Sequence, residues 1–450
     1  MKISLKRIFS KHSVVIILTL ILIFTVINTY LIVESTNSSY RTNVVDYDYV
    51  LSQDGNNYKL KNMLSGTIKS QYNEASSFLN TALTEGKSVY INPGTYTLTN
   101  DIYIINKLNP KIIGNDATII GNGYKIIVYG EDYTTSQYAT ISGLTLINTT
   151  IRVENSLGTT ITNTKFINSS IGIEFVNTNT WSEYNKVENC QFINNTQGIA
   201  FRTPQLSNAT GSYASSQIER CSFNIIDNSI GIIVEKNAQF SDSQLLNVRF
   251  WMGENGANTN QTALLADGSL DQTLLFGVVF ESFTANPNNI FAIDLGRNCD
   301  PAPTIDSVSF LGNWTARVHN PHYIWLRSTN TIFQREVTLT PGVNGQYGNQ
   351  KTIGAHPLTI ASITPKISVT GHFNPNELVT VRIQAEYLDN ILSKPVMKTF
   401  NSTGIMTLTD GDLSTLFPSQ SVIWSLIIDA KTNTATSDVS VTMSCYGTTG

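Results

Sequence analysis

Charged side chains are scarce in this chain, and their scarcity limits what it can bind. Only 14% of its 450 residues are Asp, Glu, Lys or Arg, so its surface depends on Asn, Ser and Thr. Lys2, Lys6, Arg7 and Lys11 precede the first acid, Glu34, which leaves 25 basic groups (29 minus 4) against 33 acidic ones, a net charge of −8. That sign argues against nucleic acid as a partner.

Charge is absent altogether from Ser13 to Val33, which is an apolar run long enough to span a bilayer. We therefore expect residues 1–33 to be a basic tip and an uncleaved transmembrane anchor, with a cleaved signal peptide and a secreted chain as the alternative. Basic residues before the run predict a cytoplasmic N-terminus and an extracellular bulk. Glycosylation sequons also fit export, although a chain this rich in Asn, Ser and Thr would contain about as many by chance. They begin at Asn37, Asn148, Asn168, Asn194, Asn208, Asn260, Asn313 and Asn401.

Helical periodicity is missing from most of the chain. Residues 34–65 are polar and are expected to form a stalk, and the amphipathic segment Asn73 to Leu83 predicts one short helix. Beyond it, short β-rich runs alternate with Asn, Gly and Pro, as strands joined by tight turns do.

These β-rich runs repeat, as "KVENCQFINNTQGIAF" and "QIERCSFNIIDNSIGIIV" illustrate. An aromatic or leucine anchor recurs every 20 to 31 residues, with an aliphatic residue five positions before it. Because no helix lies between the repeats, the pattern predicts strands that stack in parallel as coils. The anchors are Leu146, Phe166, Phe192, Phe223, Phe250, Phe280 and Phe310, and the aliphatic residues are Ile141, Ile161, Val187, Ile218, Leu245, Leu275 and Ile305. A second strand per coil is predicted at 172–175, 198–201, 231–234, 292–295 and 324–327.

The segments "SVYINPGTYTL", "ISGLTLIN", "VENCQFINN" and "IERCSF" resemble the right-handed parallel β-helix of the pectate-lyase-like superfamily. The resemblance implies an all-β chain in which residues 66–330 form such a β-helix. It does not imply an activity, because this scaffold carries lyases, hydrolases, tailspikes and adhesins. The enzyme signatures Asp-Asp, His-Gly and Trp-Ile-Asp-His are absent, so no catalytic residue can be assigned.

Longer alternating strands in residues 331–450 predict a C-terminal antiparallel β-sandwich, which either binds carbohydrate or serves as a cap or spacer. The four cysteines lack the spacing of a structural zinc site. Cys190 and Cys221 occupy one position of consecutive coils, where parallel Cβ bonds favour a buried thiol stack over a disulfide. Cys299 is expected in a loop and Cys445 in the sandwich core.

Charge gathers beside the second-strand column, which makes this strip the candidate ligand site. Guanidinium groups there could bind acidic sugars and carboxylates could bind hydroxyls, or Ca²⁺ if the protein is a lyase; no other cofactor and no metal is expected. The alternative is a set of solvated surface ion pairs. The strip comprises Glu174, Arg202, Glu235, Asp267, Asp294, Arg297, Trp325 and Arg327.

Aromatic residues are a second clue, because sugar rings stack on exposed aromatic faces. Of Trp181, Trp251, Trp314 and Trp325, one or two are expected to be exposed. His319 and His322 are expected in a loop and not at a metal site.

Three functions remain open. A membrane-anchored protein that binds polysaccharide at the cell surface would show exposed aromatics near the strip. A polysaccharide lyase or glycoside hydrolase would show two carboxylates, or Arg with Ca²⁺, converging in a groove. A structural or adhesive protein would show neither. Polysaccharide binding ranks first among the three functions. The sequence also leaves open whether the chain forms a homo-oligomer through the β-helix faces.

Overall fold

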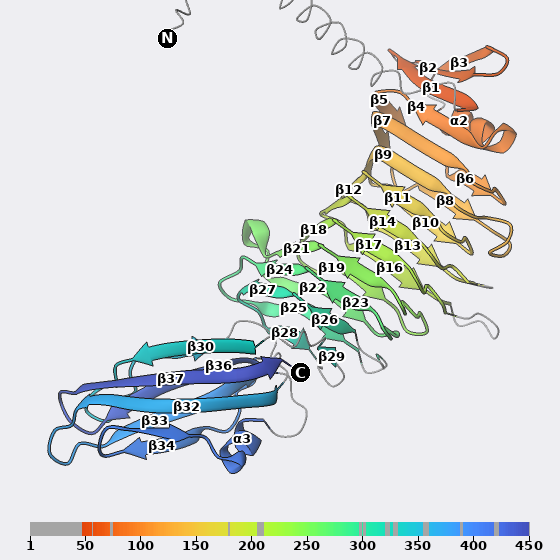
Figure 1. The fold of residues 1–450 in the computed structure, drawn as a ribbon. Coiled ribbons are helices and arrows are strands. Elements are labelled where there is room, and N and C mark those ends of the chain that lie inside the picture. The colour runs from red at the N-terminus through yellow and green to blue at the C-terminus, as the bar shows by residue number, and fades with distance from the viewer. Residues whose placement is uncertain are drawn as a thin grey trace, which may run out of the picture.

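The computed structural model describes residues 47–449, and the structure of this part of the chain is shown in Figure 1. Several short internal segments are excluded: 56, 73–74, 179–180, 205–210, 297–298, 300–302, 320–324, 327–331, 354–359, 388–389 and 418–422. The expected anchor, residues 1–33, lies outside the described residues, as do Asn37, Asn208, Arg297, His322 and Arg327. Among the described residues, no helix has both the length and the apolar character needed to cross a membrane.

The N-terminal part is a three-stranded antiparallel sheet that pairs with the first coil. Its strands are β1 (Tyr49–Asp54), β2 (Asn57–Asn62) and β3 (Ile68–Tyr72), and β1 also pairs in parallel with β4 (Ser88–Ile91). The stalk predicted for residues 34–65 is therefore wrong from Tyr49 onward. Alternating apolar residues explain the difference, because Leu51 and Leu60 bury their side chains in the main core.

The predicted amphipathic helix is present as α2 (Ala75–Glu85), and its apolar face is buried as expected. Phe78, Leu79 and Leu83 belong to the same hydrophobic cluster as the first coils. The helix thus covers the open end of the β-helix, where the first coil has no preceding coil to bury its apolar side chains.

The β-helix consists of coils that contribute strands to two parallel sheets (Figure 1). We call them sheet 1, whose coils mostly supply two short strands each, and sheet 2, to which each coil supplies one. After β4, the parallel strands of sheet 1 are β5 (Gly94–Thr97), β7 (Lys111–Ile120), β9 (Thr140–Ile147), β11 (Thr160–Thr162), β12 (Lys165–Ile167), β14 (Lys186–Glu188), β15 (Gln191–Ile193), β17 (Gln217–Glu219), β18 (Ser222–Ile225), β20 (Gln244–Leu246), β21 (Arg249–Met252), β23 (Leu274–Phe276), β24 (Val279–Ser282), β26 (Thr304–Asp306), β27 (Ser309–Gly312) and β29 (Trp325–Leu326).

Sheet 2 lies across the core from sheet 1, and one 3-10 helix, η3 (Glu254–Gly256), lies in a connection. The strands of sheet 2 are β6 (Ile102–Ile105), β8 (Lys125–Tyr129), β10 (Thr150–Glu154), β13 (Ile171–Val176), β16 (Gln197–Arg202), β19 (Ser229–Val234), β22 (Thr259–Ala266), β25 (Asn288–Leu295) and β28 (Ala316–His319).

The predicted columns are confirmed by the strand register. Phe166, Phe192, Phe223, Phe250, Phe280 and Phe310 are paired in that order, and neighbouring rings stack with centroids 4.5–5.2 Å apart. The aliphatic column is likewise continuous from Ile141 to Ile305. The described coils therefore form the right-handed parallel β-helix that the sequence predicted.

A residue with positive φ bends each coil between its two sheet 1 strands. Gly143, Asn163, Asn189 and Asn247 occupy this position, with φ between 50° and 71°. Asn is common here because its short polar side chain tolerates the left-handed region better than other L-residues do.

The C-terminal part is a β-sandwich of two four-stranded antiparallel sheets around one core. Its helix α3 (Asp410–Leu416), which the sequence did not predict, is capped by Thr409 and Asp412. One sheet contains β30 (Ile332–Leu339), β37 (Asp438–Thr449), β32 (Ile360–His372) and β35 (Gly404–Thr407); the other contains β31 (Lys351–Ile353), β36 (Ile423–Thr432), β33 (Val379–Tyr387) and β34 (Val396–Phe400).

Polar contacts connect the last coil to the sandwich. Arg317 of β28 pairs with Glu386 of β33 at 3.1 Å and donates to the side-chain oxygen of Asn390 at 2.8 Å. The Asn390 amide in turn donates to the backbone oxygen of Trp314 at 2.8 Å. The sandwich thus contacts the C-terminal end of the β-helix.

Candidate functional site

Part of the predicted charged strip forms a closed ion-pair network on the outer face of sheet 2. Its centre is Glu174 of β13, which is only 4% exposed. One carboxylate oxygen lies 2.6 Å from Arg202 Nη1, and the other lies 3.2 Å from Arg152 Nη1 and 3.4 Å from Lys125 Nζ. These residues come from four consecutive strands, β8, β10, β13 and β16, which parallel stacking places about 4.8 Å apart. Arg152 is the register partner of Glu174, whereas Lys125 and Arg202 lie two residues away from that register along their strands.

The two arginines have further acceptors within the network. Arg202 donates through Nε to Glu235 at 2.8 Å and through Nη2 to the Gln197 side chain at 2.8 Å. Arg152 pairs with Glu154, with Nη2 2.8 Å from the carboxylate. Three cations thus face three carboxylates, so Arg202, the one arginine of the predicted strip among the described residues, is already bound by protein carboxylates.

The protonation of Glu174 follows from this arrangement. Burial alone would raise its pKa, but the nearby charges of Lys125 and Arg152 and the hydrogen bond from Arg202 hold the pKa below its usual value. Glu174 is therefore a poor general acid at neutral pH. Among the residues that the structure describes, no group of three or more His, Cys, Asp or Glu could hold a metal ion.

The structure separates the other predicted strip residues from this network. Asp294 of β25 accepts a hydrogen bond from His319 of β28, with Nδ1 2.7 Å from Oδ1, and the imidazole stacks on Phe291. His319 is thus a strand residue and not the loop residue that we expected. Asp267 lies half-buried in the turn after β22, in close contact with Gly296.

Trp325 does not belong to the strip. Its strand, β29, pairs with β26 in sheet 1, with Trp325 opposite Thr304, so the predicted second strand at 324–327 is wrong. The true sheet 2 strand of that coil is β28, which the sequence reasoning overlooked because the motif around Trp325 has a similar apolar spacing. Arg297 and Arg327 lie outside the described residues.

An exposed aromatic cluster lies on the connections that lead from sheet 2 to sheet 1. Trp181 is 46% exposed and stacks on Tyr133, with ring centroids 5.5 Å apart. Tyr138 and Tyr184, at the ends of two of these connections, are 52% and 58% exposed. We call Tyr133, Tyr138, Trp181 and Tyr184 the aromatic platform. Trp181 fulfils the expectation of one or two exposed tryptophans, whereas Trp314 is buried.

Two of these tyrosines have strained backbones. Tyr138 and Tyr184 have φ of 55° and 57°, which is unusual for a bulky residue. They occupy the same turn in the coils on either side of Gly158, as the backbone hydrogen bonds show. The Tyr138 amide donates to the Leu157 carbonyl oxygen, and the Gly158 amide donates to that of Glu183. The Tyr184 amide donates to that of Ala214. The Tyr138 ring lies over Gly158, where a Cβ atom would come within 2.6 Å of it.

The sequence contained a signal for this cluster that our reasoning missed. Tyr138, Gly158 and Tyr184 each lie three residues before the aliphatic column, and the next coils carry Ser215, Asp242 and Gln272 there. Small or polar residues suit a positive-φ turn. Tyrosine does not suit such a turn, and bulky residues in strained positions of this kind are often functional, so the two tyrosines were the signal.

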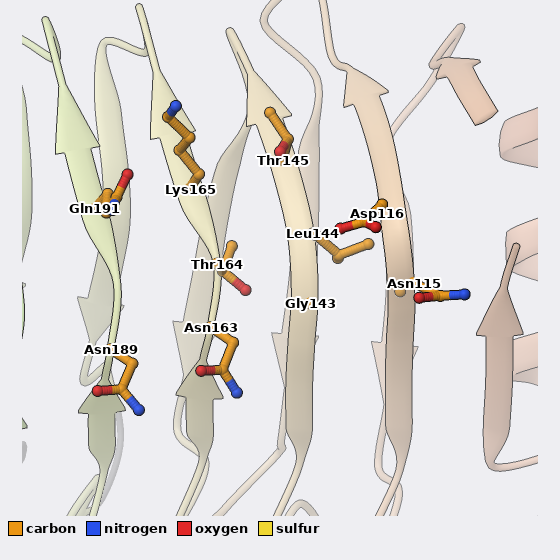
Figure 2. Close-up of a pocket in the computed structure, with 11 residues that line it drawn as sticks. Asn115, Asp116, Gly143, Leu144, Thr145, Asn163, Thr164, Lys165, Asn189 and Gln191 are labelled. Atoms are coloured by element: carbon orange, nitrogen blue, oxygen red, sulfur yellow. The ribbon is translucent and has the colours of Figure 1, made fainter. Parts of the chain in front are cut away.

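A polar groove of about 350 Å³ runs along the bend of sheet 1 over the first coils (Figure 2). Thr145, Lys165 and Gln191 form a row on β9, β12 and β15, where they are paired in register. Asn163 and Asn189 line it at the bend, and Asp116 of β7 faces it from the next strand. No sequence pattern that we used pointed to this groove.

The glycosylation candidates that the structure describes are all exposed. Asn148, Asn168 and Asn194 have positive φ and follow the sheet 1 strands of three consecutive coils. The fold therefore explains why Asn recurs there, with or without a glycan. Asn260 also has positive φ and bonds to Asn228 and Asn289, whereas Asn313 and Asn401 lie in other loops.

Three of the cysteines are free and buried, namely Cys190, Cys221 and Cys299. Burial and a hydrogen bond to Cys221 raise the pKa of the Cys190 thiol well above its usual value. The thiol stack is therefore an unreactive part of the core, and the disulfide alternative is absent from the structure.

No protein-family model matches the sequence, and no curated protein matches it. Among solved structures, the chain is similar to the surface protein and adhesin PfbA of Streptococcus pneumoniae, with 12% identity and a TM-score of 0.33 over 56% of this chain and 96% of that one. It is also similar to an alginate lyase from Paenibacillus sp. str. FPU-7, with 12% identity and a TM-score of 0.30 over 56% and 97% of the two chains. A mutant tailspike protein of E. coli bacteriophage HK620 has 10% identity and a TM-score of 0.33 over 83% and 89%. The fold is assigned from the strand register described above, and the candidate site is assigned from the geometry of this chain's own residues.

Proposed function

We propose that this protein binds polysaccharide through the aromatic platform while residues 1–33 anchor it in a membrane, with the β-helix outside the cell. The observation that carries the proposal is the exposure of Trp181, Tyr138 and Tyr184, which lie on the two coils on either side of Gly158. Aromatic rings present flat apolar faces to sugar rings, and their polar edges can bond to hydroxyl groups. Exposed aromatics without converging free carboxylates match binding better than catalysis or a purely structural role.

The chemistry of the sheet 2 face supports binding over catalysis. A glycosidase needs two carboxylates placed for acid and base or nucleophile roles, and one of them must hold a proton. Glu174 instead has a lowered pKa and three cationic partners. Glu154 and Glu235 are likewise bound to arginines.

Retention of the full-length protein, in detergent, on columns of immobilised acidic and neutral polysaccharides tests the proposal. We expect a retained polysaccharide to be identified and the Trp181→Ala, Tyr184→Ala double variant to bind it about thirtyfold more weakly, since each of the two stacked rings contributes about 1 kcal/mol. The matched control is Tyr103→Ala, which removes a 45% exposed tyrosine from β6. Equal retention of the two variants would overturn the platform, and no retention of the unaltered protein would favour a structural role.

The anchor has a separate test. An N-terminal tag should be protected from protease in intact cells and a C-terminal tag should be digested. Recovery of a secreted form that begins after Val33 would instead show that the segment is cleaved.

One observation favours a second candidate function, a polysaccharide lyase or hydrolase. A carboxylate that holds an imidazole, as Asp294 holds His319, is a common arrangement for a general base. If this pair is catalytic, the protein should release unsaturated or reducing ends from a bound polysaccharide, and His319→Ala should abolish the release. Retention without any release would leave binding as the function.

A further inference from the structure

The groove along sheet 1 is shaped by an insertion in β7. Ile113 pairs with Ser142 and Ala117 with Leu144, so residues 114–116 all lie opposite Gly143. A Cβ atom on Gly143 would come within 2.3 Å of the Gly114 carbonyl oxygen, and Gly143 has φ of 71°. Glycine is therefore required there for the bulge to approach β9. The bulge places Asp116 at one side of the groove.

The lining residues end three coils further along, at Asn189 and Gln191. Arg220 occupies the bend position of the coil after Asn189, and its Nε donates to the Asn189 side-chain oxygen at 3.0 Å. Its guanidinium also pairs with Glu188 and Glu219. The groove thus lies between a bulge and an anchored arginine side chain, and does not extend along the whole β-helix.

Most polar side chains that line the groove form no hydrogen bond to any residue that the structure describes. This distinguishes them from the sheet 2 network, in which each charged group has partners. Hydrogen-bonding groups that the fold leaves unused in a concave site are available to a ligand. The groups concerned are the side chains of Asn115, Asp116, Thr145, Asn163, Lys165 and Gln191.

The chemistry of these groups defines a ligand class. One carboxylate and one ammonium group give no net charge, so the groove favours neither a polyanion nor a metal ion. The amides and the threonine hydroxyl both donate and accept, as a polyhydroxylated ligand requires. Thr145, Lys165 and Gln191 span about 10 Å, since adjacent strands lie about 4.8 Å apart.

We propose that this groove binds an uncharged saccharide of a few sugar units, with Asp116 accepting from its hydroxyl groups and Lys165 donating to them. The site is separate from the aromatic platform, because residues 140–142 of β9 and the whole of β11 and β14 lie along the coils between the two. It therefore goes beyond the proposed function, and either site can fail without the other.

The test uses the full-length protein in detergent and a panel of neutral trisaccharides containing glucose, galactose, mannose or N-acetylglucosamine in α and β linkages. Hydrogen–deuterium exchange should show that at least one trisaccharide slows exchange in the segments around 114–116 and 143–145. Calorimetry should then show that an Asp116→Ala, Lys165→Met double variant binds it at least tenfold more weakly.

The matched control is Asp242→Ala with Lys236→Met, which removes the same two charges from exposed positions outside the groove. It should bind as the unaltered protein does, and so should Trp181→Ala, which affects only the platform. The proposal is overturned if no trisaccharide in the panel slows exchange at the bulge, or if the groove variant and its control bind equally well.

Discussion

Two regions on the outer faces of the β-helix, the sheet 2 network and the sheet 1 groove, use their polar residues in opposite ways. On sheet 2, Lys125, Arg152 and Arg202 surround the nearly buried Glu174, and each charge has a partner. On sheet 1, the groove carries amide side chains without hydrogen-bond partners among the described residues, and the platform of exposed aromatic rings lies on the connections that lead into this sheet. The ion-paired network on sheet 2 therefore has less capacity left for a ligand than the groove has.

This difference shows why local charge density is a weak guide to function in a charge-poor chain. Parallel stacking places side chains of consecutive coils about 4.8 Å apart, so opposite charges in one column pair with each other. Such ladders hold coils in register. The residues left without partners are better candidates for recognition.

The largest effect should come from removing the centre of the network. Glu174→Gln leaves two guanidinium groups and a lysine without their shared carboxylate, and should lower the free energy of unfolding by about 2–3 kcal/mol, since the group is buried but its partners are partly exposed. Urea denaturation of the purified protein measures this loss.

Glu235→Gln is the matched control for this prediction. Glu235 has one partner, Arg202, and its side chain is 39% exposed, so its loss should change the free energy of unfolding by less than about 1 kcal/mol. Equal effects of the two substitutions would show that Glu174 is no more structural than a surface ion pair.

A smaller effect is expected from acid. The folded-state pKa of Glu174 is lowered, so its contribution to stability is fully present above the unfolded pKa and is lost as pH falls through the folded pKa. The difference in unfolding free energy between the unaltered protein and Glu174→Gln should therefore be constant near neutral pH and shrink below about pH 4. A difference that grew on acidification would contradict the lowered pKa.

The sequence predicted the β-helix well because its core repeats. Phe192 and Phe223 recur at equivalent positions, and burial of one face produces a period of two that can be read directly. The stalk was mispredicted because β1 and β2 form an antiparallel pair outside the repeat. The site was harder to predict, since whether Arg202 is free or paired depends on its neighbours in space and not on its own motif.

The smallest expected effect concerns the strained platform residue Tyr184. A bulky residue with φ of 57° costs about 1 kcal/mol relative to one that tolerates this region, and Tyr184 is 58% exposed, so its ring loses little burial when removed. Tyr184→Asn should therefore raise the free energy of unfolding by about 0.5–1 kcal/mol while weakening retention on polysaccharide. Denaturation and retention measurements on the same preparation test both effects.

Ser215→Asn supplies the control for this last prediction, because Ser215 occupies the same turn in the next coil, with φ of 55°. It should change the free energy of unfolding by less than Tyr184→Asn does, because serine already tolerates the turn, and it should leave retention unchanged, which tests whether a new asparagine at this turn affects binding by itself. If Tyr184→Asn lowered stability instead, the ring would have a structural role. If it raised stability without weakening retention, a strained tyrosine would stand at this turn without serving the site, and the contrast between the two faces would rest on the groove alone.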